Sequence, residues 1–166
     1  SNATLGVGTA DAPALAAEAQ EEALRDALTS IDAADDLALA ARLDRWQDAL
    51  NAARATAPTA PIFGFPSMLV ELFLRMDAVQ RELASMNPND RAAALASIRR
   101  ALGFDDEAIA RYAALDERRE ARWQNGLTYM EERARLISTF EGDALDTELQ
   151  ALRKDRFGHE APTIAR

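Results

Sequence analysis

The segment from Asp105 to Thr139 contains no proline and carries helical periodicity throughout, so the sequence predicts one long helix there. Its middle, DERREAR at residues 116–122, has six charged residues in seven. A helix that is polar on all sides does not fit inside a hydrophobic core, so this middle is expected to cross solvent or to bridge two packed ends. We therefore expect an elongated, helical-repeat-like molecule.

The rest of the chain is also predicted to be helical. Alternating strand periodicity is essentially missing, and the 48% hydrophobic content is rich in alanine and poor in valine and isoleucine. The sequence therefore predicts an all-α fold of five or six helices. The expected helices are residues 14–29, 34–55, one from Ser67 through Met86, one from Asn89 or Asp90 to Gly103, 105–139, and one after EGD that ends near Gly158.

The beginning of the chain is expected to lie outside the helical domain. Ser1-Asn2-Ala3 resembles the scar of a cleaved expression tag, and the small residues that follow are typical of a linker. We expect residues 1–13 to be scar and linker and residues 14–166 to be an all-helical domain. A removed signal peptide or membrane anchor would explain such a linker. The HEAPTIAR string at the end is typical of the first turn of a further helix.

Charge and composition exclude several classes of function. The net charge of -9 and the pI near 4.7 argue against a nucleic-acid or anionic-membrane ligand. There is no cysteine, and His159 is the only histidine, so neither a thiolate site nor a histidine-based triad or metal site is expected. The acidic clusters lack the spacing of a calcium loop, and capping of helix starts accounts for them. We expect no catalytic residue, metal or cofactor.

Two similar phrases contain the only two tryptophans, RWQDAL at 45–50 and RWQNGL at 122–127. A second pair of similar strings follows them, IRRALGFDDEAIAR at 98–111 and LRKDRFGHEAPTIAR at 152–166. The order of the matches predicts two related units, about 34–111 and 112–166, with Trp46 and Trp123 in equivalent packed positions. Stacked units of this kind form extended surfaces rather than clefts.

Binding of a partner is the function that these residues favour. Tryptophan and arginine are enriched in binding hot spots, and methionine adapts to irregular partners. A packed position in a helix is the alternative interpretation of each tryptophan. The candidate partner-binding residues are Arg45, Trp46, Arg122 and Trp123, with Phe63, Phe65, Phe73 and Met76 as a second patch.

The strings EAIARYAALDERREARWQNGLTYMEERARLI at 107–137 and LQALRKDRFGHEAPTIAR at 149–166 resemble the lipase-specific foldases, or lipase chaperones. The resemblance covers about residues 90–166. It implies a periplasmic steric chaperone, anchored in the inner membrane through its N-terminus, that clasps a secreted lipase without ATP. The family's Arg-x-x-Phe-Asp-Tyr motif is absent, and the nearest string, from Arg100 to Asp106, has one residue too many and no tyrosine.

These observations together predict a non-enzymatic periplasmic binding protein whose partner is a protein client, a secreted lipase or another hydrolase. Two alternatives stay open. One is a compact helical bundle that binds a small apolar ligand or serves as an enzyme subunit, and the other is a structural, oligomeric protein.

Overall fold

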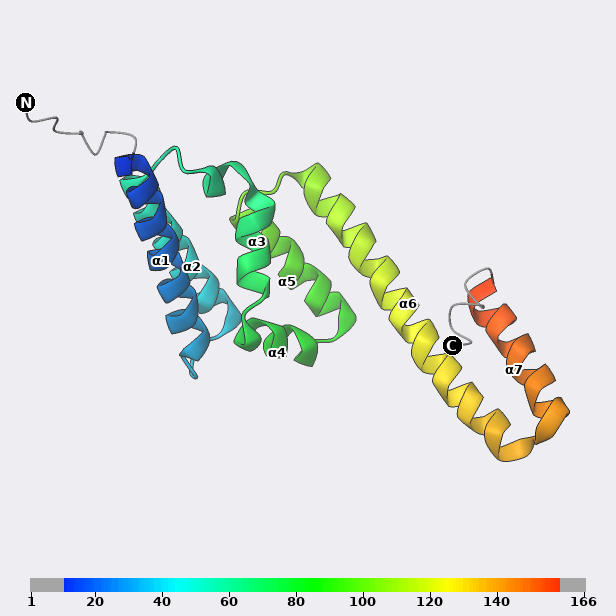
Figure 1. Ribbon diagram of the computed structural model, residues 1–166. Coiled ribbons are helices and arrows are strands. Elements are labelled where there is room, and N and C mark those ends of the chain that lie inside the picture. Colours follow the sequence, from blue (N-terminus) through cyan, green and yellow to red (C-terminus); the bar gives the residue numbers. More distant parts are fainter. Residues whose placement is uncertain (1–10, 159–166) are drawn as a thin grey trace, which may run out of the picture. The chain divides into compact units, whose positions relative to one another are not determined.

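The computed structural model describes residues 11–158, and within them it contains seven α-helices, one short 3₁₀ helix and no strand (Figure 1). The all-α prediction is confirmed, but five or six helices was an underestimate. The elements are α1 (Asp11–Ala33), α2 (Leu39–Thr56), η1 (Pro61–Gly64), α3 (Pro66–Leu74), α4 (Asp77–Ser85), α5 (Pro88–Ala101), α6 (Asp106–Thr139) and α7 (Gly142–Phe157).

The chain divides into two compact units, one that ends at Ala113 and one that starts at Ala114, so the boundary falls inside α6. The first unit contains α1 to α5 and the first residues of α6. The second unit contains the rest of α6 and α7. The predicted long helix is confirmed, because α6 runs without a break from Asp106 to Thr139.

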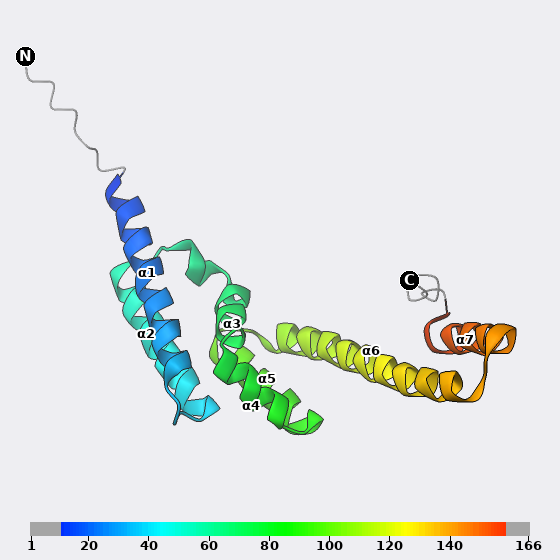
Figure 2. The same ribbon diagram turned by 60° about the horizontal axis from the view of Figure 1, so that its bottom comes forward.

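The core of the first unit forms where α2 meets its neighbours. α1 and α2 lie side by side in Figures 1 and 2. Trp46 on α2 is completely buried, and its Nε1 donates a hydrogen bond to the Leu69 carbonyl of α3 at 3.3 Å. Phe73 on α3 is also completely buried. Aromatic burial of this extent contributes about 3–5 kcal/mol per side chain, as large-to-alanine substitutions show.

The helix predicted from Ser67 through Met86 is wrong, because the structure divides it into α3 and α4 with a break at Arg75 and Met76 (Figure 1). No proline or glycine marks this break. The carboxylate of Asp32, near the end of α1, accepts hydrogen bonds from the backbone N–H groups of Asp77 (3.3 Å) and Ala78 (2.8 Å). A carboxylate from a distant helix therefore caps the first turn of α4.

At other helix ends in the first unit, long arginine side chains donate hydrogen bonds to the backbone carbonyls. Arg42 of α2 is buried, and its guanidinium donates to the Ile31 and Ala34 carbonyls where α1 ends. Arg91 of α5 donates to the Leu83 (2.9 Å) and Met86 (2.9 Å) carbonyls where α4 ends. Because the last four carbonyls of a helix have no partner inside it, these arginines supply the missing donors.

Several helix starts also differ from the predictions. α1 begins at Asp11 and ends at Ala33, so it is longer at both ends than the expected 14–29. α5 is capped by Asn87, whose Oδ1 accepts from the Asp90 N–H at 2.8 Å, and not by Asn89 or Asp90. α3 starts at Pro66 and its N-cap is Phe65, not Ser67. Pro66 and Pro88 explain both shifts, because proline is favoured in the first turn, where its missing N–H is not needed.

Two predicted helix ends are confirmed. Gly103 has a φ of 107° directly after α5, as expected of a residue that ends a helix. α7 ends at Phe157, next to Gly158. Of the linker expected at residues 1–13, only 11–13 are described, and they belong to α1. The expected helical turn in HEAPTIAR lies outside the described residues.

We predict that Arg42→Met lowers the free energy of unfolding of the first unit by about 3 kcal/mol, because it removes charge-assisted hydrogen bonds to buried carbonyls. Arg45→Met is the matched control, since Arg45 lies on the same helix and is exposed. Urea unfolding followed by circular dichroism measures both. Equal unfolding midpoints for the two variants would contradict the capping role of Arg42.

Candidate functional site

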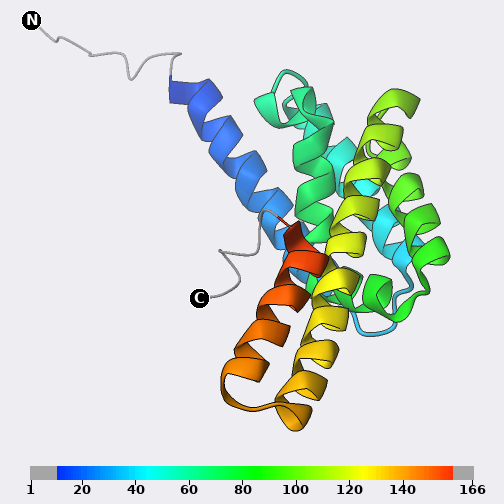
Figure 3. The ribbon, with the colours of Figure 1, turned by 90° about the vertical axis from the view of Figure 1, so that its right-hand side faces the viewer.

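The second unit is an antiparallel helical hairpin, in which α6 from Ala114 onward and α7 lie side by side (Figure 3). The chain turns at Phe140 and Glu141 between them. Tyr129 of α6 is buried, and its ring meets the Phe157 ring of α7 edge-on with 5.1 Å between the centroids. This contact holds the end of α7 against the middle of α6.

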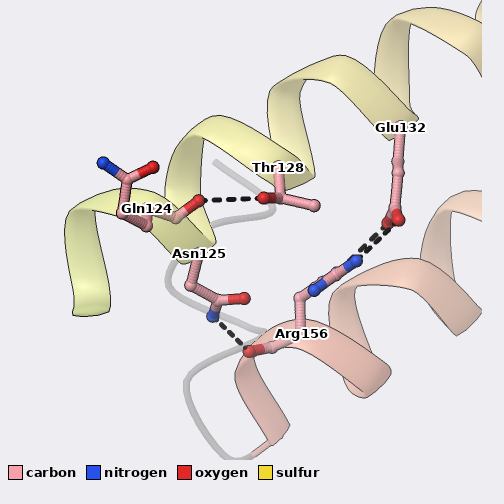
Figure 4. Close-up of polar contacts among 5 residues, drawn as sticks. All are labelled: Gln124, Asn125, Thr128, Glu132 and Arg156. Atoms are coloured by element: carbon pink, nitrogen blue, oxygen red, sulfur yellow. Dashed lines mark hydrogen bonds and ion pairs between the residues drawn. The ribbon is translucent and has the colours of Figure 1, made fainter.

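Arg156 joins the two helices of the hairpin through both its backbone and its side chain (Figure 4). Its carbonyl accepts a hydrogen bond from Nδ2 of Asn125 at 2.7 Å. Its guanidinium forms a two-pronged contact with the Glu132 carboxylate, with nitrogen–oxygen distances of 3.1 and 2.6 Å. The hydrogen bonds from Arg156 lower the pKa of Glu132 below its usual value, and the same contact raises the pKa of Arg156.

The other side of α6 carries apolar side chains that remain open to solvent. We call Trp123, Leu127, Met130 and Ile137 the α6 stripe; each is between 42% and 64% exposed. Their spacings of four, three and seven residues put them on one face of the helix. The same arithmetic puts Asn125, Tyr129 and Glu132, which contact α7, on the opposite face.

Charged residues border the α6 stripe along its length. On the helix, Arg133 lies on one flank and Glu131 on the other, and Arg119 lies one turn before Trp123 in line with the stripe, from their positions in the helical repeat. At 1.5 Å per residue the stripe extends for about 21 Å. An apolar strip between charged flanks has the composition of a protein-binding surface, in which an apolar centre is surrounded by a polar rim.

Three of the predicted partner-binding residues are not at the surface. Trp46 and Phe73 are completely buried and Met76 is only 4% exposed, all in the core of the first unit. Their assignment to a binding patch was wrong. Spacing alone placed them on apolar helix faces, and in this protein those faces are covered by other helices of the same unit.

The remaining predicted residues are accessible to different degrees. Arg122 and Trp123 are exposed neighbours on α6, so Trp123 belongs to the α6 stripe and Arg122 lies beside it. Phe65 and Arg45 are exposed in the first unit. Phe63 is half-buried against the core, and the Arg54 guanidinium lies 4.7 Å from its ring centre.

Sequence reasoning missed Leu127, Met130 and Ile137, although their helical spacing from Trp123 was visible. The same spacing is typical of a buried face, so periodicity could not distinguish a core residue from an exposed one.

The predicted equivalence of the two tryptophans is wrong. Trp46 is fully buried and bonded to the Leu69 carbonyl, whereas Trp123 is 64% exposed. The repeated RWQ phrase therefore occupies two different environments. Alanine- and arginine-rich helices are built from few residue types, so similar short strings arise in them by chance. This is enough to account for the similarity of the two RWQ phrases.

Other kinds of site find no support in the described part of the chain. Residues 11–158 contain no group of three or more acidic or histidine side chains placed to hold a metal ion. Asp105 has a structural role there: its Oδ1 accepts from the Ala108 N–H at 2.8 Å in the first turn of α6. None of the described helices combines the length and the apolar character needed to cross a membrane. The chain matches no known family model, no curated protein and no solved structure.

We predict that Glu132 stabilises the hairpin above its unfolded pKa and that this stabilisation is lost as the pH falls through its lowered folded pKa. Glu132→Gln should therefore lower the thermal unfolding temperature near neutral pH, and the difference from the unmodified protein should shrink at acidic pH as Glu132 becomes protonated. Glu131→Gln, at the exposed neighbouring position, is the control. Circular dichroism melts over this pH range test the prediction, and a difference that does not depend on pH would contradict it.

The two tryptophans should also differ in accessibility to solvent. We expect acrylamide to quench the fluorescence of the Trp46→Phe variant, which retains exposed Trp123, several times more strongly than that of the Trp123→Phe variant. Stern–Volmer plots of the two variants measure the difference. Similar quenching of both would restore the equivalence of the RWQ phrases.

Proposed function

We propose that this protein is a non-enzymatic helical binding protein that holds a protein client on the α6 stripe of its second unit, as a steric chaperone of the foldase kind. The observation that carries the proposal is the exposure of Trp123, Leu127, Met130 and Ile137 on one face of α6. A tryptophan and three aliphatic or thioether side chains in one row are costly to leave in water. Covering them with a complementary apolar surface removes this cost.

The second support is the identity of the residues around the stripe. Trp123 and the adjacent Arg122 are of the two residue types most enriched in interface hot spots. Met130 is flexible and fits surfaces of irregular shape, as a client that is not fully folded presents. Charged flanks suit reversible binding, because they keep the unoccupied surface soluble and exclude partners of the wrong charge pattern.

The third support is the resemblance of residues 90–166 to the lipase-specific foldases, since the α6 stripe and α7 both lie in this part of the chain. From that resemblance we infer a secreted lipase as the client, the periplasm as the compartment and an N-terminal membrane anchor in the precursor. The missing Arg-x-x-Phe-Asp-Tyr motif limits the inference to holding the client. It gives no residue that would activate a lipase.

Refolding of a denatured secreted lipase from the same organism tests the proposal. We expect the yield of active lipase to rise with added protein, to saturate near a stoichiometric ratio and to need no nucleotide. Trp123→Ala should weaken binding of the lipase by at least 2 kcal/mol, or roughly 30-fold in Kd, if Trp123 is the anchor of the surface.

Leu15→Ala is the matched control, because Leu15 is an equally exposed apolar side chain on α1. It should leave lipase binding unchanged. A refolding yield that is indifferent to the protein would refute the chaperone proposal. If the yield rises but Trp123→Ala and Leu15→Ala behave alike, the α6 stripe is not the client surface. Sedimentation of the protein alone distinguishes a further outcome, in which the stripe joins two copies of this chain.

A further inference from the structure

The α6 stripe has the spacing of a seam that packs against another helix. Ala134 is exposed and lies between Met130 and Ile137, so the apolar row from Trp123 to Ile137 advances by four, three, four and three residues. This alternation is the heptad spacing of helices that pack along each other. The stripe therefore suits a second helix better than a strand, whose side chains repeat every two residues.

Gly126 interrupts the side chains beside this stripe. It lies in the interior of α6, where glycine is less favourable than alanine because it loses more conformational freedom on folding. Its φ is not positive, so its backbone conformation does not require glycine. Apart from its two neighbours in the chain, a Cβ at this position would have no side chain and no other element within 4 Å. Nothing among the described residues therefore requires a glycine here.

The missing side chain opens a hole next to the exposed tryptophan. Residues at positions i, i+3, i+4 and i+7 of a helix surround one hole, into which a side chain of a partner helix inserts. Trp123, Gly126, Leu127 and Met130 form such a set, and its three side chains are apolar and exposed. Because Gly126 contributes no side chain, the hole leaves room for a large apolar group.

The two charges that flank the seam differ in sign. Glu131 lies on one flank and Arg133 on the other, and both are within one helical turn of Met130 and Ala134. Residues at these flanking positions pair with charges on the partner helix. The matching helix therefore carries a basic residue opposite Glu131 and an acidic residue opposite Arg133, on either side of its own apolar seam.

We infer that the segment held by the α6 stripe is an amphipathic helix of the client, which inserts a leucine or phenylalanine into the hole at Gly126. The inference rests on the proposed function and names the partner of that same surface. It makes Gly126 a specificity-determining residue, since the hole accepts a bulky side chain only while the glycine leaves it open. The bound helix covers Trp123, Leu127 and Met130 together and removes their apolar surface from water.

Two synthetic peptides of about 21 residues, or three heptads, test the kind of segment that binds. They have the same composition of leucine, alanine, lysine and glutamate. In the first, the leucines alternate in spacing between three and four residues, with lysine along one flank and glutamate along the other. In the second, the leucines stand at every second residue. We expect only the first peptide to bind the full chain, measured by the fluorescence anisotropy of a dye on the peptide at nanomolar concentration. Equal binding of the two peptides, or binding of neither, would overturn the helical partner.

Substitutions at Gly126 separate binding from stability. Gly126→Ala should raise the thermal unfolding temperature, because alanine favours the helix, and yet weaken binding of the first peptide roughly fivefold or more, because the methyl group narrows the hole. Gly126→Leu should weaken binding further. Thr128→Ala is the matched control, since it also favours the helix but lies on the other side of α6, and it should leave binding unchanged. Binding by Gly126→Ala that equals or exceeds that of the unmodified protein would overturn the role of Gly126.

The failure of this inference can be distinguished from the failure of the proposed function. If Trp123→Ala weakens lipase binding and Gly126→Ala does not, the α6 stripe still holds the client and the helix in the hole is wrong. If lipase refolding is indifferent to the protein while the first peptide binds and responds to Gly126→Ala, the chosen client is wrong and the helical partner stands. A protein that sediments as a dimer, and as a monomer after Gly126→Ala, would assign the stripe to a second copy and overturn the client helix.

Discussion

The first unit depends on polar side chains that reach from one helix to the open end of another. Arg42 of α2 donates to the carbonyls at the end of α1, and Asp32 of α1 accepts from the first N–H groups of α4. Gln20 of α1 donates to Ala53 near the end of α2. Short helices leave many backbone groups without partners, and burying those ends without such contacts would be costly. Helix ends can lie close to the core around Trp46 and Phe73 because side chains from other helices form hydrogen bonds with the free backbone groups at those ends.

In the second unit, α6 has an apolar face on each of two sides, and among the described residues of this unit only one helix, α7, is present to cover them. One side, with Tyr129, packs against Phe157 of α7 and is fixed by the Arg156 contacts to Asn125 and Glu132. A single helix can cover only one side of its neighbour. The α6 stripe is therefore left exposed by the topology of a two-helix hairpin, and this makes it the natural place for a partner.

Local periodicity was enough to predict an all-α chain, the uninterrupted α6 and the end of α5 just before Gly103, because these features depend on residues within a few turns of each other. The break between α3 and α4 was not predictable in this way, since the carboxylate that caps the start of α4 belongs to Asp32, forty-five residues before Asp77. The same limit applies to function. Trp46 and Trp123 stand in nearly the same six-residue phrase, yet one is fully buried and the other is 64% exposed. Neighbouring helices cover Trp46 and leave Trp123 open, and only their packing could decide which of two apolar faces remains at the surface.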